Sequence, residues 1–286
     1  MRIGCHVSIA GGIEQSVIRA ENLDINTMQI FSKNSRTWKE KIYSPAEIDH
    51  FQKALQQTDI SPVFIHTSYL INLASSDEVI SARSITAFLA ELERADALLS
   101  NSGVPYLIVH PGAHQGAGEE YGLEMIIKAL KVALKHLVSL NLSTMILLEN
   151  TSGSGTNLGY SFSQLRYIME GIHWSEKIGF CLDTCHAFAA GYNLSNEKGI
   201  EDIITELGNK IGLERLIIIH LNDSKYSFNS RKDRHMPIGD GFIGLEGFKL
   251  LVNHPSLKDL PFILETPRQN DEDDRRNINL VKSLRE

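Results

Sequence analysis

Short apolar runs recur through the chain, each followed by a segment of helical pattern, and this alternation limits the fold more than any other feature. The eight runs are RIGCHVS (2–8), NTMQIFS (26–32), PVFIHTS (62–68), YLIVHPG (106–112), TMILLEN (144–150), IGFCLDT (178–184), LIIIHLN (216–222) and PFILETP (261–267). Most are nearly continuous in apolar residues, which is typical of strands buried on both faces of a parallel sheet. The chain is therefore expected to alternate β-strands with α-helices.

The segments between these runs carry the apolar spacing and the start signals of helices. Helical patterns cover 44–57, 76–100 and 119–140, and Ser44 stands directly before Pro45, an order typical of a helix N-terminus. Strands alternating with helices over nearly the whole chain predict an α/β fold, a single (β/α)8 TIM barrel. About 250 residues is typical of that fold. Because no linker or shift in composition interrupts the pattern, we expect one catalytic domain over 1–286.

A doubly wound open sheet is the alternative fold for alternating strands and helices. That fold usually has fewer strands, and here it would need a glycine-rich phosphate-binding turn after the first strand. The stretch HVSIAGG follows that strand but lacks the G-x-G-x-x-G spacing. Gly153 and Gly155 come closer to a glycine-rich loop, yet they follow the fifth run and no Lys-Ser/Thr pair ends them. The barrel is therefore the better prediction.

Composition and charge narrow the class of protein. The chain has 286 residues, 42% of them hydrophobic and 22% charged, which is a globular composition. A formal net charge of −7 argues against a general binder of the phosphate backbone, since such binders rely on Lys and Arg. Three cysteines cannot all be paired and the N-terminus does not resemble a signal peptide, so a reducing, cytoplasmic location is expected. The apolar runs fall far short of the roughly 18–20 residues of a membrane span, so no membrane partner is expected.

Six successive runs end in a residue that can bind a metal ion. In a parallel barrel all strand C-termini open onto one face, so residues far apart in the sequence would converge there. A single histidine at such a position is more often a hydrogen-bonded core residue, but six potential ligands in a row are not explained that way. The six are His66, His110, Glu149, Asp183, His220 and Glu265.

Three further ligand-type residues follow those strand ends at short spacing. In LDTCH, His186 lies three residues after Asp183, so a helical turn would turn both toward one site. In RKDRH, Asp233 and His235 lie two apart, which in extended backbone places both on the same side. The total of five histidines, two aspartates and two glutamates is enough for two or three metal ions. Imidazole with carboxylate suits zinc best, ahead of manganese or iron.

The reaction follows from the number of metals and from the nucleophiles that are missing. Cys181 and Cys185 lie beside the ligands, but nitrogen and oxygen ligands already suffice, so both are expected to be structural thiols. No G-x-S-x-G motif supplies a serine nucleophile, which favours activated water. Paired divalent ions suit the hydrolysis of phosphate esters, whose transition state spreads negative charge over oxygens. A sugar isomerase or epimerase with one or two metals, and a non-catalytic metalloprotein that binds damaged DNA, are the alternatives.

Several motifs between Gly4 and about Pro267 resemble one known family. They are GCHVSIAGG, FSKNSRTW, HTSYLINLAS, VHPGAH, LENTSGSGTNLG, GFCLDTCHAFAAGY, HLNDSK, KDRHMPIGDGFIG and ETP. On these residues the chain resembles endonuclease IV, the family of zinc-dependent apurinic/apyrimidinic endonucleases of base-excision repair. The resemblance implies a xylose-isomerase-like TIM barrel and a hydrolase of the deoxyribonuclease IV (phage-T4-induced) type. It also implies a monomer that acts on double-stranded DNA containing abasic sites.

The resemblance also implies how the nine residues divide among three zinc ions, with Mn²⁺ able to replace zinc at some positions. The first ion would take His66, His110 and Glu149; the second would share Glu149 and take Asp183, His220 and Glu265; the third would take His186, Asp233 and His235. Glu149 and Glu265 would be catalytic, because carboxylates set the acidity and orientation of bound water. A hydroxide between the first two ions would attack the phosphorus 5' to the abasic site, leaving a 3'-hydroxyl and a 5'-deoxyribose phosphate.

The loop SKNSRTWKEK after the second run has four basic residues against one acidic residue. The resemblance implies that Arg36, Tyr69 and Leu70 insert into the duplex at the lesion. Unstacking a base step costs a few kcal/mol and costs least where a base is already missing. Three Zn²⁺ ions would bring the formal charge from −7 to about −1, so the acidic total does not exclude DNA as a partner.

Overall fold

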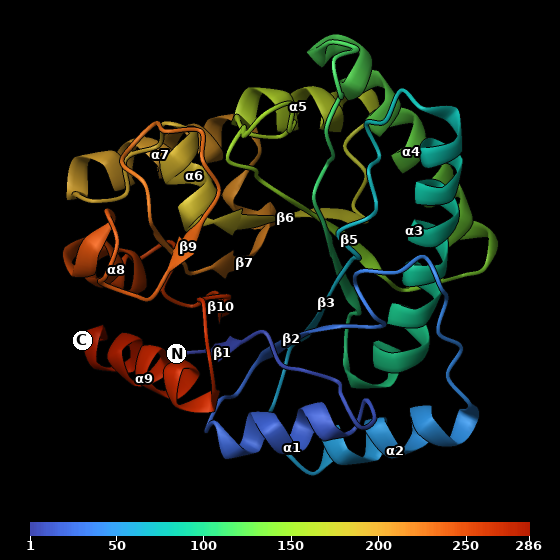
Figure 1. Ribbon diagram of the computed structural model, residues 1–286, viewed down its shortest axis with the longest axis horizontal. Coiled ribbons are helices and arrows are strands. Elements are labelled where there is room, and N and C mark those ends of the chain that lie inside the picture. Colours follow the sequence, from blue (N-terminus) through green and yellow to red (C-terminus); the bar gives the residue numbers. More distant parts are fainter.

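Eight parallel strands form the centre of the computed structural model, which describes all 286 residues (Figure 1). The strands are β1 (Ile3–Cys5), β2 (Met28–Phe31), β3 (Val63–His66), β4 (Tyr106–Val109), β5 (Met145–Glu149), β6 (Ile178–Asp183), β7 (Leu216–His220) and β10 (Phe262–Leu264). Each lies within its predicted run, and the sheet order β1-β10-β7-β6-β5-β4-β3-β2 makes successive strands neighbours. A parallel bridge between His6 and Gln29 joins the two end strands. The predicted TIM barrel is confirmed.

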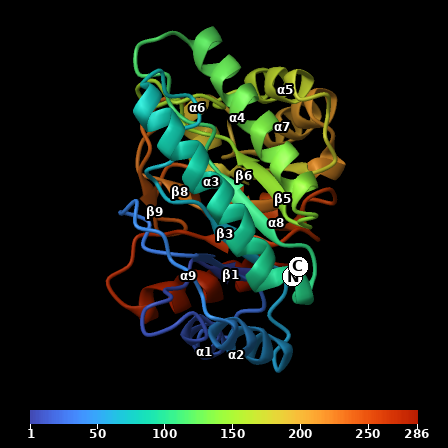
Figure 2. The same cartoon turned by 90° about the vertical axis from the view of Figure 1, so that its right-hand side faces the viewer.

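Helices surround the strands on the outside, as Figures 1 and 2 show from two directions. They are α1 (Gln15–Asn22), α2 (Pro45–Gln56), α3 (Glu78–Leu99), α4 (Glu119–Ser139), α5 (Phe162–Gly171), α6 (Thr184–Ala190), α7 (Glu197–Lys210), α8 (Gly244–Asn253) and α9 (Asp271–Leu284), with short 3₁₀ turns at Ser100–Ser102 and Leu213–Arg215. The predicted helices at 44–57, 76–100 and 119–140 correspond to α2, α3 and α4. No helix combines the length and the apolar character that crossing a bilayer requires.

The start of α2 has the capping arrangement that its sequence predicts. Glu47 donates its backbone N–H to the Ser44 hydroxyl at 3.3 Å, and the Ser44 backbone N–H donates to the Glu47 carboxylate at 2.8 Å. The two bonds satisfy donors that a helix N-terminus otherwise leaves unpaired. Helix α2 therefore begins at Pro45, which also fixes where the preceding loop ends.

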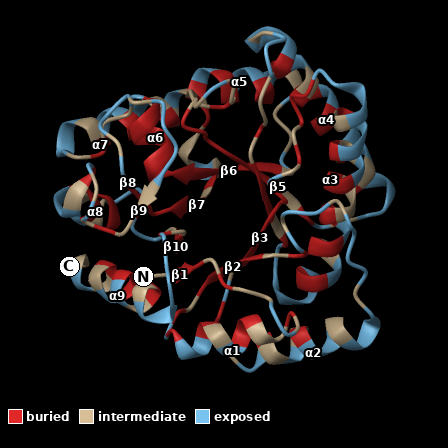
Figure 3. Ribbon diagram, in the orientation of Figure 1, coloured by how far each residue is buried: buried red, intermediate tan, exposed pale blue.

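Two separate hydrophobic cores hold the barrel together, and Figure 3 shows the strands as its most buried part. The larger core, of 65 buried residues, lies between the strands and the surrounding helices. The smaller core lies inside the barrel and takes one residue from each of six strands. Its members, which we call the barrel floor, are Phe64, Ile108, Leu147, Cys181, Ile218 and Ile263.

Each floor residue is followed two positions later by one of the six predicted strand-end ligands. Side chains alternate along a strand, so residues i and i+2 point to the same face. The ligands must therefore point into the barrel, one layer above the floor. We call these six residues the ligand layer. They are His66, His110, Glu149, Asp183, His220 and Glu265.

Strands β1 and β2 contribute different residue types at the level of the floor. Gly4 pairs in register with Ile263, and Gln29 with Phe64, which puts both at the level of the floor. A Cβ atom on Gly4 would lie 1.8 Å from the Thr27 carbonyl oxygen, so only glycine lets the two strands approach this closely. Gln29 therefore brings a polar amide to the floor level, directly beneath the ligand layer.

Candidate metal centre

The Glu149 carboxylate lies at the centre of the ligand layer, fully buried and surrounded by imidazoles. One of its oxygens is 3.1 Å from Nε2 of both His66 and His110. The other is 3.1 Å from Nδ1 of His220 and 3.3 Å from Nδ1 of His186. Burial alone would raise the pKa of Glu149, but His220 and His110 hold it well below its usual value. Glu149 is therefore ionised and has a nitrogen ligand near each of its oxygens.

The Glu265 carboxylate approaches His220 at Nδ1, the same ring nitrogen that contacts Glu149. Glu265 Oε2 is 3.3 Å from His220 Nδ1, and Glu149, Asp183, His220 and Glu265 each offer a ligand atom within 4.8 Å of the others. Burial would raise the pKa of Glu265, but His220 contributes to lowering it to about 2. Three carboxylates around one imidazole concentrate negative charge, which a divalent cation would balance.

A third group of ligand atoms comes from α6 and from the loop before α8. Asp183 caps α6, its carboxylate accepting the backbone N–H of His186 at 2.7 Å, so the predicted helical turn is present. His186 Nε2 is 3.2 Å from Asp233. His235 begins β9 (His235–Met236), which pairs with β8 (Asp223–Ser224), and its Nε2 lies 3.6 Å from Asp183 and 3.8 Å from Asp233.

Nitrogen Nε2 of His235 provides a test of whether a metal fits this third group. It is buried and has no hydrogen-bond partner. Its other nitrogen, Nδ1, lies 3.1 Å from the Glu265 backbone carbonyl, which accepts a hydrogen bond from it. When the ring binds a metal through Nε2, the proton stays on Nδ1 and the lone pair of Nε2 faces the carboxylates of Asp183 and Asp233. A lone pair directed at carboxylate oxygens is unfavourable without a cation between them, so the residues fit a bound metal ion.

Two thiols lie within reach of the same ligand atoms. Cys181 groups with Glu149 and His220, and Cys185 with Asp233 and His235. Burial raises the pKa of both thiols to about 12. Because thiols bind metals as thiolates, protonated cysteines agree with their predicted structural role.

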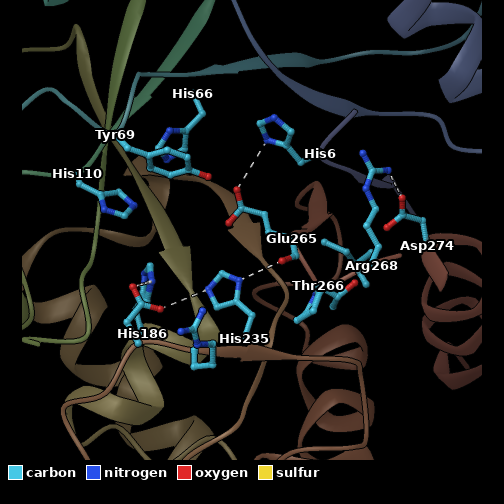
Figure 4. Close-up of a pocket in the computed structure, with 14 residues that line it drawn as sticks. His6, His66, Tyr69, His110, His186, His235, Glu265, Thr266, Arg268 and Asp274 are labelled. Carbon is cyan, nitrogen blue, oxygen red and sulfur yellow. Dashed lines mark hydrogen bonds and ion pairs between the residues drawn. The ribbon is translucent and has the colours of Figure 1, made fainter. Parts of the chain in front are cut away.

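The ligand layer opens into a cavity of about 430 Å³, shown in Figure 4. The imidazoles of His66, His110, His186 and His235 reach it from strands, a loop and helix α6, with Glu265 between them. Its rim includes two basic residues, Arg234 and Arg268, and Arg268 is paired with Asp274. A polar cavity with both ligand-type residues and guanidinium groups is suited to an anionic substrate.

The predicted DNA-contacting residues lie on two loops at the mouth of this cavity. Tyr69 is 65% exposed and its ring lies 5.2 Å from that of Phe31. Leu70 lines an adjoining cavity of about 510 Å³ together with Tyr69. Arg36 is exposed on the neighbouring loop. The Ser68 hydroxyl donates to the Ser35 carbonyl at 2.7 Å, which joins the two loops.

The basic loop offers less free positive charge than its sequence suggests. Lys33 is only 4% exposed, and its ammonium group donates to the Thr37 carbonyl at 2.7 Å. Lys41 pairs with Glu47 at 2.7 Å. Lys33 therefore holds the loop together from inside, and Arg36 and Lys39 are its exposed, unpaired cations.

Sequence reasoning missed two asparagines that hold the ligands in place. Asn222 donates to the Asp183 carboxylate at 2.7 Å and accepts the Glu265 backbone N–H at 2.8 Å. The Asn150 side chain accepts the Asp183 backbone N–H at 2.7 Å, and the Asn150 backbone carbonyl lies 3.0 Å from His186 Nδ1. Both amides stand within two residues of a ligand in the sequence, a spacing that could have pointed to them.

Comparisons with known proteins agree with the fold and with the family that the sequence resembles. The family model described as a xylose isomerase-like TIM barrel matches residues 17–284. The probable endonuclease 4 of Chloroflexus aurantiacus is 47% identical over 284 residues, covering 99% of this chain and 98% of the relative. The probable endonuclease 4 of Halothermothrix orenii is 41% identical, covering 100% of this chain and 99% of the relative.

Solved structures give the same comparison in three dimensions. Endonuclease IV from Thermus thermophilus has a TM-score of 0.86 and 35% identity, covering 99% of this chain and 98% of its own. A 3-keto-D-glucoside 4-epimerase from E. coli has a TM-score of 0.69 at 14% identity, covering 99% of both chains. At that identity the second likeness extends to the fold alone.

Proposed function

The chain belongs to the endonuclease IV family, and from that premise we propose that it is a DNA-repair hydrolase which cuts the phosphodiester on the 5' side of abasic sites. The products are a 3'-hydroxyl and a 5'-deoxyribose phosphate. The observation that carries the proposal is the ligand layer, in which six strand-end residues meet two positions above an apolar floor. Three of the six, His66, His110 and Glu265, line a cavity that also has two arginines. Because burying so many ionisable groups together costs free energy, the arrangement points to function rather than to stability.

Three zinc ions complete the site in this proposal. The first would be held by His66, His110 and Glu149, the second by Asp183, His220 and Glu265 with a shared Glu149, and the third by His186, Asp233 and His235. Zinc in these positions would acidify water and balance the charge that develops on phosphate oxygens. The geometry supports the first two groups most directly, because their ligand atoms lie within 4.8 Å of one another.

The two catalytic glutamates have different roles because their side chains differ in exposure. The Glu149 side chain is 0% exposed and has an imidazole nitrogen near each oxygen, so it holds the ligand layer together. The Glu265 side chain is 19% exposed and faces the cavity. With its pKa lowered to about 2, Glu265 is ionised at neutral pH, so its carboxylate can accept a hydrogen bond from water that enters the cavity. Glu265 therefore orients the attacking water.

Arg36, Tyr69 and Leu70 recognise the lesion in double-stranded DNA. Tyr69 and Leu70 present apolar surface at the mouth of the cavity, and Arg36 presents a free cation beside them. An abasic site has already lost a base, so such a wedge opens it at the lowest cost in stacking energy. Arg234, which forms no ion pair, attracts the phosphate toward the ligand layer from the rim of the cavity.

A cleavage assay with defined substrates tests the proposal. A duplex with one abasic site, labelled at either end, is incubated with zinc-loaded protein. An intact duplex and a ketose are tested in parallel incubations. We expect a nick only at the lesion, with a 3' end that a DNA polymerase extends directly. Turnover of the ketose with the oligonucleotide uncut would instead favour a sugar isomerase or epimerase. Retention of the oligonucleotide without a nick would favour a non-catalytic binder of damaged DNA.

A further inference from the structure

We propose that Gln29 is a positioning residue for the metal centre, because its side-chain amide sets which nitrogen of His220 faces the ligand layer and fixes the carboxylate of Glu265. The inference rests on the metal centre proposed above. Gln29 is fully buried on β2, at the level of the barrel floor. All six residues of the floor carry apolar or thiol side chains, so this amide is the exception.

The Gln29 amide joins three residues around the site at once. Its nitrogen donates to Glu265 Oε1 at 2.7 Å. The same nitrogen lies 3.0 Å from His6 Nδ1, and its oxygen lies 2.7 Å from His220 Nε2. Two donors and one acceptor of a single amide are therefore all used, with no direct contact to solvent.

The direction of these bonds follows from one fixed point, the Glu265 carboxylate. An ionised carboxylate only accepts hydrogen bonds, so the amide nitrogen must face Glu265 and the amide oxygen must face His220. An amide oxygen only accepts, so His220 must donate from Nε2. In a neutral ring the lone pair is then on Nδ1, the nitrogen that lies 3.1 Å from Glu149 and 3.3 Å from Glu265.

His6 supports the same orientation from the other side of the amide. Its Nδ1 can accept the second N–H of Gln29 only if the ring is neutral. The amide can therefore not reverse without losing its bonds to Glu265 and to His6 together.

An apolar side chain at position 29 would remove this constraint without touching a ligand. His220 could then carry its proton on either nitrogen, and a proton on Nδ1 would have to leave before a metal could bind there. Glu265 would lose the donor that holds its Oε1. Loss of such supporting hydrogen bonds typically weakens metal affinity 10–100-fold.

Gln164 provides a matched control, since it is another buried glutamine with both ends of its amide bonded. It lies on α5, donates to Glu119 at 3.1 Å and accepts the Gly159 backbone N–H at 2.7 Å. None of its partners is a predicted ligand. Gln164→Leu and Gln29→Leu thus remove similar buried hydrogen bonds, but only the second removes them from the metal centre.

The test measures zinc affinity in the full-length protein by competition with a chromophoric chelator, and the absorption spectrum after cobalt substitution. We expect Gln29→Leu to weaken one ion about 10–100-fold, to leave the other ions unchanged and to alter the cobalt spectrum. Cleavage by this variant should lose kcat with little change in KM. Gln164→Leu should match the wild type in both metal measurements.

Two outcomes would contradict the positioning role of Gln29, and a second variant keeps the test decisive if the first does not fold. Wild-type zinc affinities and an unaltered cobalt spectrum in Gln29→Leu would overturn the positioning role, even if the variant unfolded more easily. If Gln29→Leu does not fold, Gln29→Met keeps the length of the side chain without its hydrogen bonds, and the same comparison applies. A wild-type protein that binds no zinc would overturn the metal centre itself, and with it this inference.

Discussion

The barrel floor and the ligand layer lie two residues apart on the same six strands, yet they have opposite chemistry. On β5, Leu147 belongs to the floor and Glu149 to the ligand layer, and both side chains are fully buried. The two layers therefore differ in chemistry and not in burial. The floor gains free energy by removing apolar surface from water. The ligand layer brings buried carboxylates together at a cost in free energy, which a bound cation would offset.

The largest effect should come from Glu265→Gln in the ligand layer. The variant keeps the size of the side chain but removes the charge that orients water, so cleavage should fall at least about a thousandfold. DNA binding and folding should persist, as measured by fluorescence anisotropy and circular dichroism. Glu170→Gln, which changes an exposed carboxylate on α5, is the control and should remain fully active. An active Glu265→Gln enzyme would contradict the role proposed for this layer.

A change in the floor should have the reverse pattern. Leu147→Ala opens a cavity inside the barrel and should lower the free energy of unfolding by about 2–5 kcal/mol, measured by urea denaturation. The folded fraction should still bind zinc in full. Val138→Ala on α4 removes apolar atoms from a side chain that is 79% exposed, and should change stability by less than about 0.5 kcal/mol. If Leu147→Ala lost zinc while remaining stable, the two layers would not be separable.

Removing zinc tests the ligand layer as a whole. Each ion that binds only the folded state should add about 2.7 kcal/mol at a free concentration one hundred times its Kd. Treatment with a chelator should therefore lower the thermal unfolding midpoint, and added zinc should restore it. An unchanged midpoint would mean that the carboxylates and imidazoles satisfy one another without metal.

The smallest of these effects should come from outside both layers, at the mouth of the cavity. Tyr69→Ala should weaken binding to an abasic duplex by about 1–3 kcal/mol, the range for loss of an aromatic stacking contact with a base. Metal content should stay the same. Tyr121→Ala, at an exposed tyrosine of α4, should leave binding unaltered. Loss of metal in Tyr69→Ala would show that Tyr69 supports the site rather than the DNA.

The sequence predicted the ligand layer because period-two alternation and parallel strands fix where strand-end residues go. The eight runs located every barrel strand, although each strand is shorter than its run. The spacing of Asp183 and His186 also correctly predicted a helical turn, because a helix cap depends only on neighbouring residues. These successes share one cause: the information lies within a few residues of chain.

What the sequence could not predict depends on contacts between distant segments. Gln29 is one polar residue inside an apolar run, and its partners His220 and Glu265 are 191 and 236 residues away. Lys33 looked like a free cation of the basic loop, but the fold turns it inward to the Thr37 carbonyl. Neither position carries a local signal, because hydrogen-bond partners across a barrel are set by strand register.

The measurement that tests the central claim most directly is cleavage of a single-lesion duplex by metal-free protein as zinc is added stepwise. The account predicts no cleavage without zinc, then a nick on the 5' side of the abasic site that rises to a plateau at about three ions per chain. Full activity in excess chelator, or a plateau at one ion, would contradict it. So would zinc uptake to three ions with the duplex left uncut.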